Sequence, residues 1–471
     1  MGCSRRRCLG YRTIPGHIRK YIDTYAVGRR WWLSPGSIKG IDNIVVIPSL
    51  AESQRLFTTL SHLSKNDAAE KQRTMVICVI NNRGVQSTPP EDIEDNRTTL
   101  AILRNLVDGK VSRPSSVNAH IADSCRNIIQ NNLKVAYVDA SSPGCEMPER
   151  FGGVGLARRI GLDLALQAFD YEGGERNLLV SLDADTIVED AYLGAIRNFF
   201  ARSKCEAAVV EFNHQDAATA VEQAAICCYE LFLRYYVLGL GYARSPYAFH
   251  AIGSTMVCTA DGYAAVRGMN RRRAGEDFYF LNKLAKLRGI GRIGATRVYP
   301  SSRESHRVPF GTGRRITRFL DGDSPEYVVY DQRIFEVLKR WLACVSEEPQ
   351  SSGDILLGRA DDIHPELATF LRKKHFTEVW SRLQSNTNNT LRLLRHFHQW
   401  FDGFKTLMLI HHLTRTAMPR VKMFDALGEL FVMVERKCPV RAEAGAIPSL
   451  QQQMQILDHI RHVERAMFNA L

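Results

Sequence analysis

Short runs of apolar, often β-branched residues that end in polar or acidic residues constrain the fold of this chain most strongly. Four such runs occupy residues 43–52, 74–84, 133–144 and 177–186, and a fifth, "AAVVEF", occupies 207–212. Helical periodicity lies between several of them, for example over 155–169. Continuous apolar strands that alternate with helices predict an α/β fold with a mainly parallel, Rossmann-like sheet covered on both faces.

The ends of these predicted strands carry most of the polar side chains. The first four runs end in Pro48–Glu52, in Asn81-Asn82, in Asp139–Ser142 and in Asp183-Ala184-Asp185. In parallel sheets, ligands bind beyond the carboxyl ends of the strands. We therefore expect these residues to gather at one edge of the sheet, although they are far apart in sequence.

Asp183 and Asp185 follow the apolar stretch "LLVSL" and place two like charges at the end of a buried strand. Two such carboxylates persist at low cost when a cation or a basic partner lies between them. Mg²⁺ and Mn²⁺ prefer oxygen ligands and keep positions open for phosphate oxygens. The alternative is structural, since an acid here could cap a helix that begins near Ile187.

A second acidic pair, Glu276-Asp277, opens the amphipathic segment 273–290. The functional interpretation makes Asp277 a general base that takes the proton from an incoming hydroxyl. The structural alternative is the ordinary preference for negative charge at a helix N-terminus.

Length and texture divide the 471 residues into regions. We predict a basic N-terminal tail over 1–40, an α/β domain over 41–325 and a helical C-terminal region over 326–471. Within the α/β domain, residues 87–99 are expected to form a polar loop and 100–132 to be mostly helical. Two or three domains suit this length.

The net charge of +12 favours an anionic partner but does not choose among nucleotides, nucleic acid and an acidic membrane surface. The eleven cysteines are scattered without a CxxC pair, which favours free thiols in a reducing cytosol, and we find no signal peptide. The apolar segment 224–242 contains Glu230 and Arg234 and is expected to be an amphipathic or buried helix. We therefore expect a cytoplasmic protein that can contact the inner membrane surface.

Six motifs occur in an order and spacing that resemble a known family. They are "VVIPSLAE", "YVDASSPG", "GLARRIGLDLA", "LLVSLDADT", "AIGSTMVC" and "AGEDFYFLNKL". Together, over about residues 43–320, they resemble the inverting nucleotide-sugar glycosyltransferases of the family 2 type, which have the GT-A fold. The resemblance implies a divalent metal, Mn²⁺ or Mg²⁺, a nucleotide-sugar donor and a hydroxyl acceptor, whether a glycan, a lipid-linked molecule or a small molecule.

The resemblance also implies roles for single residues. The donor would contact Pro48, Glu52, Arg158, Asp183, Gly253 and Ser254. Asp185, with Asp183, would hold the metal against the diphosphate. Asp277 would be the catalytic base, and Glu276 would orient the acceptor.

The chain departs from the family pattern at the second strand, which ends in Asn81-Asn82 where many relatives have an acidic turn. An acidic turn follows the third strand instead, so we count Asp139 among the donor-binding residues while its role stays open.

The segment 301–315 follows the predicted base and is basic. Arg303 and Arg307 are predicted to pair with the diphosphate as part of a closing loop, and His306 to add a nitrogen ligand to the metal. The alternative is a solvated basic loop.

Two other function classes remain open. A sugar-phosphate nucleotidyltransferase also presents acids at strand ends, although "PSLAESQRL" lacks its glycine-rich loop. A basic adaptor for nucleic acid or a membrane surface would use the tail and Trp31-Trp32, but no nucleic-acid signature is visible. We expect no nucleic-acid partner, and we expect the C-terminal helices to offer a surface for homo-oligomer formation.

Overall fold

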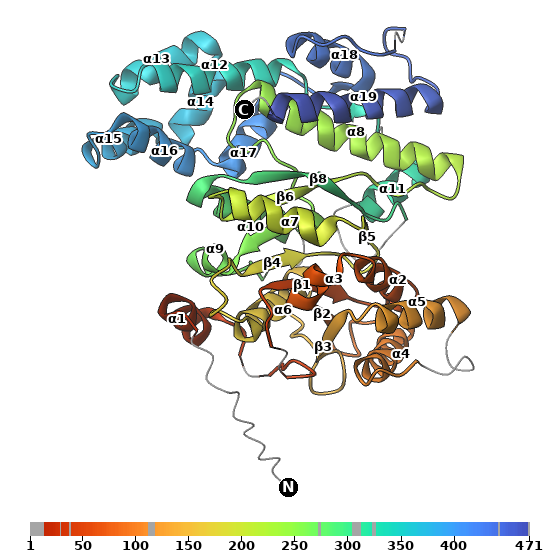
Figure 1. Ribbon diagram of the computed structural model, residues 1–471. Helices are drawn as coiled ribbons and strands as arrows, with labels where there is room; N and C mark the ends of the chain where they lie inside the picture. The colour runs from red at the N-terminus through yellow and green to blue at the C-terminus, as the bar shows by residue number, and fades with distance from the viewer. Residues whose placement is uncertain are drawn as a thin grey trace. The chain divides into compact units, whose positions relative to one another are not determined.

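The computed structural model describes residues 14–28, 30–36, 39–111, 118–271, 275–303, 312–322, 326–440 and 443–469 (Figure 1). The chain forms two compact units. The first contains Met1–Gln215 and Ala251–Ser301, and the second contains Asp216–His250 and Ser302–Leu471. The predicted domain boundaries stay a prediction; this division differs from them, because the segment 216–250 belongs with the C-terminal helices.

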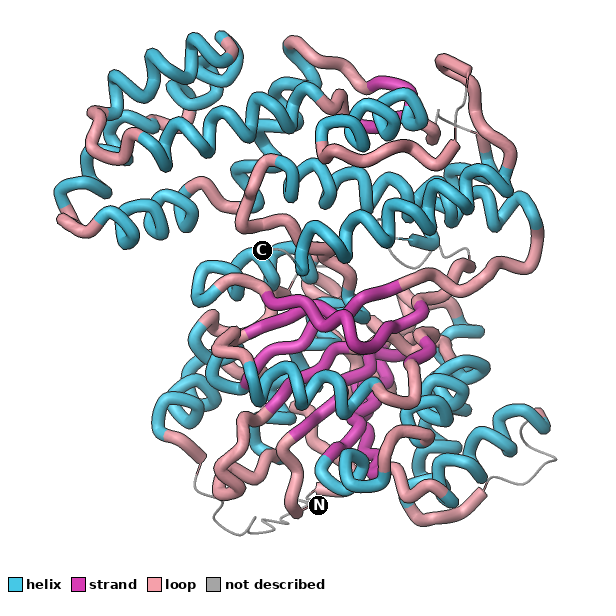
Figure 2. Tube along the Cα trace, turned by 45° about the horizontal axis from the view of Figure 1, so that its top comes forward, coloured by secondary structure: helices cyan, strands magenta, loops and turns pink. Residues whose placement is uncertain are grey.

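An eight-stranded sheet forms the centre of the first unit (magenta in Figure 2). Its strands are β1 Asn43–Ser49, β2 Thr74–Asn81, β3 Lys134–Ala140, β4 Leu178–Ser181, β5 Ile187–Val188, β6 Ala207–Phe212, β7 Met256–Thr259 and β8 Gly291–Tyr299. They lie in the order β3-β2-β1-β4-β7-β6-β8-β5.

The strands β1 to β4 run parallel, and β7 then pairs antiparallel with both β4 and β6. Ile44 of β1 faces Met75 of β2 and Leu179 of β4 in register. This confirms the predicted α/β class with a mainly parallel sheet of GT-A type. All five predicted strands are present, whereas β5, β7 and β8 were not predicted.

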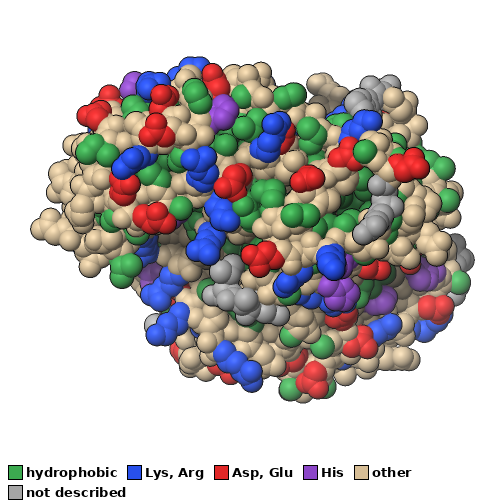
Figure 3. All heavy atoms as spheres, turned by 90° about the horizontal axis from the view of Figure 1, so that it is seen from above, with side chains coloured by type: hydrophobic (Ala, Val, Ile, Leu, Met, Phe, Trp, Pro, Cys, Tyr) green, Lys and Arg blue, Asp and Glu red, His purple; other side chains and the backbone are tan. Residues whose placement is uncertain are grey.

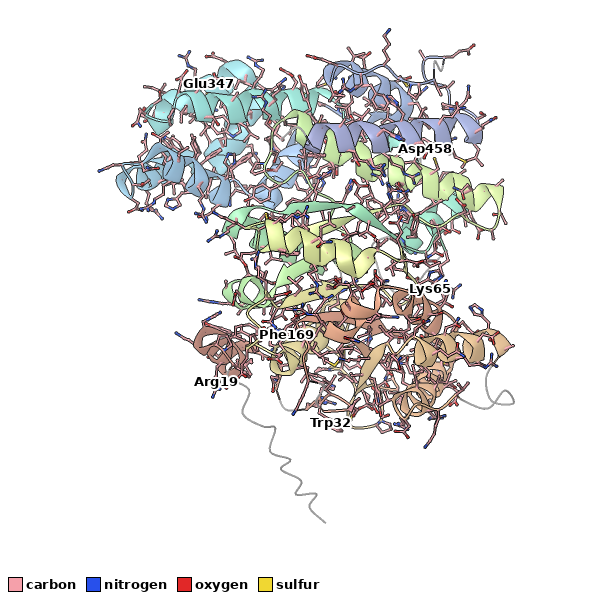
Figure 4. All side chains as sticks on the ribbon, in the orientation of Figure 1. Arg19, Trp32, Lys65, Phe169, Glu347 and Asp458 are labelled. Carbon is pink, nitrogen blue, oxygen red and sulfur yellow. The ribbon has the colours of Figure 1, made fainter. Side chains whose placement is uncertain are left out.

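Helices cover the sheet of the first unit. They are α1 Gly16–Tyr25, α2 Ser53–Ser64, α3 Ala68–Arg73, α4 Pro90–Val107, α5 Ala119–Gln130, α6 Val154–Ala168, α7 Tyr192–Arg202, α9 Ala260–Ala265 and α10 Glu276–Arg288. Helix α6 packs closely on β1 and β2 because Gly161 has no side chain, and a Cβ there would lie 2.9 Å from Val79 Cγ2. Phe169, labelled in Figure 4, follows this helix and is fully buried.

The predicted polar loop over 87–99 is wrong for most of its length, because α4 begins at Pro90. Proline at the first helical position is already restricted to a helical φ angle, and Glu91 and Asp92 add negative charge to the first turn. The polar composition of this segment concealed those start signals.

A buried polar network fastens α1 to α6. The Oδ1 atom of Asp163 accepts hydrogen bonds from the hydroxyls of Tyr21 and Tyr263, each at 2.7 Å, and Oδ2 accepts one from the Val27 N–H at 2.8 Å. Arg159 lies 3.4 Å from the same carboxylate. Asp163 is fully buried, so its charge depends on these partners.

The second unit is mainly helical, with a short antiparallel pair of strands, β9 Val328–Val329 and β10 Val421–Lys422. Its helices are α8 Ala220–Tyr242, α11 Thr312–Asp321, α12 Arg333–Glu347, α13 Gly353–Ile363, α14 Pro365–Lys373, α15 Phe376–Ser385, α16 Thr390–Trp400, α17 Gly403–Thr416, α18 Met423–Met433 and α19 Leu450–Asn469. On the face drawn in Figure 3, basic and acidic side chains are interspersed.

Helix α8 is the one helix of the described residues that is long and apolar enough to cross a membrane, and 72% of its apolar window is buried inside the protein. It packs against α19, and Arg234 of α8 pairs with Glu230 at 2.8 Å and with Glu464 of α19 at 2.5 Å. This agrees with the expectation of an amphipathic or buried helix.

Candidate functional site

Arg158 of α6 lies at the centre of a cluster of charged side chains in the first unit. Its Nη1 donates a hydrogen bond to Glu276 Oε1, and its Nη2 donates one to Asp183 Oδ1. The Arg158 side chain is only 4% exposed. One guanidinium thus joins two carboxylates that lie on different segments of the chain.

Three segments supply the cluster: helix α6, the loop after β4 and the start of α10. Strand β4 ends at Ser181, so Asp183 lies just beyond its carboxyl end, as predicted. Helix α10 begins at Glu276, and Gly275 before it adopts a φ of +69°, a conformation that favours glycine. The fold therefore brings Asp183 and the Glu276-Asp277 pair together across almost a hundred residues.

Asp277 is the carboxylate of this cluster whose pKa is shifted towards neutral pH. Burial, followed by the adjoining carboxylate of Glu276, raises the pKa of Asp277 to about 7. Arg158 and the hydrogen bond from the Phe278 N–H at 2.7 Å oppose this rise. A carboxylate with this pKa has the acidity that suits a general base near neutral pH.

Gly253 and Ser254 also lie at the cluster, in a single 3₁₀ turn before β7. A Cβ on Gly253 would lie 2.6 Å from the guanidinium carbon of Arg158, so a side chain there would displace the guanidinium from its present position. Ser254 is fully buried, and its hydroxyl has no hydrogen-bond partner among the residues that the structure describes.

Two residues of α4 that were not predicted as site residues, Asp95 and Asn96, hold the loop after β1. Asn96 of α4 accepts a hydrogen bond from the Ala51 N–H at 2.9 Å, and Asp95 accepts one from the Ser53 N–H at 3.0 Å. Ala51 has a φ of +51°, which is unusual for a residue with a side chain. The sequence offered one signal for this role, the adjacent Asp95 and Asn96 in the segment that was predicted to be a polar loop. Glu52 is buried here, at the N-terminus of α2.

Asp139 shapes its own loop. Its Oδ1 accepts hydrogen bonds from the N–H groups of Ser141 at 3.1 Å and Ser142 at 2.9 Å. Arg104 of α4 lies 4.0 Å from its Oδ2. These contacts build the turn after β3, so a structural function accounts for this carboxylate; its predicted contact with a donor stays a prediction.

Asp185 is half-buried, and its carbonyl accepts a hydrogen bond from Gln215 Nε2 at 2.9 Å. The structural alternative for this acid is wrong, because residues 187–188 form β5 and the next helix begins at Tyr192. Within the described ranges, no group of three or more His, Cys, Asp or Glu side chains has a metal-binding arrangement. The two carboxylates of the Asp-Ala-Asp triplet offer oxygen, the donor type that a hard cation prefers, and their binding of a metal stays a prediction.

The other predicted site residues have different outcomes. Pro48 lies in β1 and is buried. Arg303 belongs to the second unit, and His306 and Arg307 lie outside the described residues. The residues that the structure brings together are therefore Arg158, Asp183, Gly253, Ser254, Glu276 and Asp277, while their roles and the other assignments stay predictions.

Solved structures match this chain, whereas the two other comparisons found nothing. No protein-family model and no curated protein matches the sequence. Among solved structures, TarS residues 1–349 of S. aureus in complex with UDP-GlcNAc matches at 11% identity and a TM-score of 0.35, covering 71% of this chain and 92% of that one. The mannosyltransferase PcManGT from Pyrobaculum calidifontis, in complex with GDP-Man and Mn²⁺, matches at 12% identity and a TM-score of 0.34, covering 82% and 93%. Similarity at this level does not assign an activity to the chain.

Proposed function

We propose that this protein is a glycosyltransferase that moves a sugar from a nucleoside-diphosphate donor to an acceptor hydroxyl with inversion. The observation that carries the proposal is the position of Asp277. It has a pKa of about 7 and lies in the same cluster as Asp183, which follows a central parallel strand. Ligands bind at that edge of such sheets.

Asp277 would act on the acceptor. As the acceptor oxygen forms a bond to the anomeric carbon, its proton passes to the Asp277 carboxylate, and the bond from that carbon to the diphosphate oxygen breaks. The electron pair leaves with the nucleoside diphosphate. One displacement of this kind inverts the anomeric configuration, and a single base of suitable pKa is sufficient for it.

A divalent metal would be held by Asp185 and Asp183. When bound, it would supply charge that stabilises the departing diphosphate. Oxygen donors favour Mg²⁺ or Mn²⁺ over zinc. The Asp183 Oδ1 is already bonded to Arg158, so Asp185 is the stronger candidate for the metal.

The sequence resemblance supports the donor class, because the quoted motifs fall on β1, β3, α6, β4, β7 and α10 in order. The shape of the pocket and the residues that line it would select the base and the sugar of the donor. The acceptor remains a hydroxyl of unassigned class.

The test is a screen of nucleotide sugars with Mn²⁺ or Mg²⁺, in which released nucleoside diphosphate is measured without and with added acceptors. We expect release from one donor class, abolished by EDTA and strongly reduced in Asp277→Asn. Asp190→Asn, an exposed acid of the same unit, is the matched control and should retain activity. Failure of every donor with every divalent ion would contradict the proposal, and a product with retained anomeric configuration would contradict the single displacement.

A further inference from the structure

The surroundings of Arg158 suggest a role other than the predicted donor contact. Resting on the proposed function, we propose that Arg158 is a positioning residue. Its guanidinium ties the start of α10 to the end of β4 and so holds Asp277 in place without touching the donor.

The contacts of Arg158 leave little of its guanidinium accessible to a ligand. Nη1 is bonded to Glu276 and Nη2 to Asp183, while Nε is buried without a hydrogen-bond partner among the described residues. With 4% of the side chain exposed, a phosphate would have to displace a carboxylate to reach it. Both polar ends of the guanidinium are thus committed to the protein itself.

Gly253 leaves room for the Arg158 guanidinium because it has no side chain. A Cβ at residue 253 would lie 2.6 Å from Arg158 Cζ, which is closer than real Cβ atoms approach their neighbours. Gly253 does not have a positive φ, so backbone conformation does not require glycine here. Its requirement is steric, and it is matched to one side chain.

We call the arrangement of Arg158 between Asp183 and Glu276 the clamp, and it prevents repulsion between these carboxylates. Without the guanidinium, Asp183 and Glu276 would be two carboxylates with no opposite charge between them, next to Asp277. Removing one partner of a buried ion pair is costly because the remaining charge stays buried, which here applies to Glu276, whose side chain is 5% exposed. A lysine keeps the charge but lacks the planar fork that reaches two carboxylates at once.

The first test is thermal unfolding, which needs no substrate. Arg158→Met should lower Tm by several degrees, on the order of 4 °C or more. Adding Asp183→Asn and Glu276→Gln should recover at least half of the loss, because no uncompensated charge remains. The matched control is Arg159→Met, the next residue and also buried, which pairs with Asp163 instead. If the two carboxamides recover both arginine variants equally, or neither, the proposal is overturned.

A second cycle tests the steric match between Gly253 and Arg158, and its wild-type arm, Gly253→Ala alone, needs no Arg158 variant. Gly253→Ala should lower Tm in the wild-type protein, whereas in an Arg158→Ala background the same change should cost much less, because the guanidinium is gone. Additive losses would show that Gly253 is not matched to Arg158.

A third measurement separates positioning from donor contact, using nucleoside diphosphate with Mn²⁺ and the transfer reaction. In Arg158→Lys, the donor Kd should change less than about threefold while kcat falls more than about tenfold. The opposite pattern, a weaker Kd with kcat kept, would overturn the proposal. If the wild-type protein binds no nucleotide, the proposed function fails, whereas the two unfolding cycles still decide whether the clamp exists.

Discussion

Glu276 and Asp277 begin the same helix, and the Glu276 carboxylate acts together with burial to hold the pKa of Asp277 at about 7. Only the ionised form of Asp277 can accept a proton. We therefore expect kcat/KM to rise about tenfold per pH unit below pH 7 and to level off above it. Glu276→Gln removes the adjoining negative charge and should move this limb to lower pH, as measured by pH–rate profiles of both proteins. A profile that is flat between pH 5 and 8 would contradict the assignment of the base.

Replacing Asp277 should separate catalysis from donor binding. Asp277→Asn keeps the shape of the side chain but cannot accept the proton, so turnover should fall by about 10²–10⁴-fold, the usual contribution of a general base. The affinity for nucleoside diphosphate, measured by calorimetry, should stay close to that of the wild type. An Asn variant with full activity would exclude Asp277 as the base.

The same variant should be more stable than the wild type at high pH. The folded protein holds the Asp277 proton up to about pH 7, whereas the unfolded chain loses it near pH 4, so the free energy of unfolding falls as pH rises between these values. Asp277→Asn lacks this dependence and should gain on the order of 4 kcal/mol relative to the wild type between pH 4 and pH 8, because the two pKa values differ by about three units. Urea unfolding at both pH values measures the difference. A wild-type stability that rises over this interval faster than that of the variant would have the wrong sign.

Asp163 should be a structural residue of the first unit. Asp163→Asn removes the charge that faces Arg159 and disturbs two tyrosine hydrogen bonds, so we expect a loss of about 3–5 kcal/mol in the free energy of unfolding. Asp261→Asn is the control, because that side chain is 65% exposed and its ion pair with His17, at 2.7 Å, lies at the surface. Its effect should be below about 1 kcal/mol. Equal losses in both variants would contradict the role of the buried network.

Three of the five strands that the sequence predicted share one property. Strands β1, β2 and β4 are fully buried along their length, so each forms an unbroken apolar run between polar ends. Strand β8 mixes buried, half-buried and exposed residues and contains two glycines, while β5 has only two residues. Their strand character comes from tertiary pairing, which local composition does not record.

The candidate site shows the same limit. Asp183 and Asp277 could be predicted because acids after an apolar strand and at a helix start stand out in sequence. The pairing of Arg158 with both Asp183 and Glu276 could not, because it depends on how α6, β4 and α10 meet in space. Likewise, the contact that requires glycine at residue 253 is visible only once the guanidinium has a position.

The most direct test of metal-dependent donor binding is a calorimetric titration of nucleoside diphosphates into the wild-type protein and Asp185→Ala, each with Mn²⁺ and with EDTA. We predict Mn²⁺-dependent binding to the wild type that is at least about tenfold weaker in Asp185→Ala, with Asp190→Asn behaving as the wild type does. Absence of binding, or binding that neither EDTA nor Asp185→Ala weakens, would contradict it.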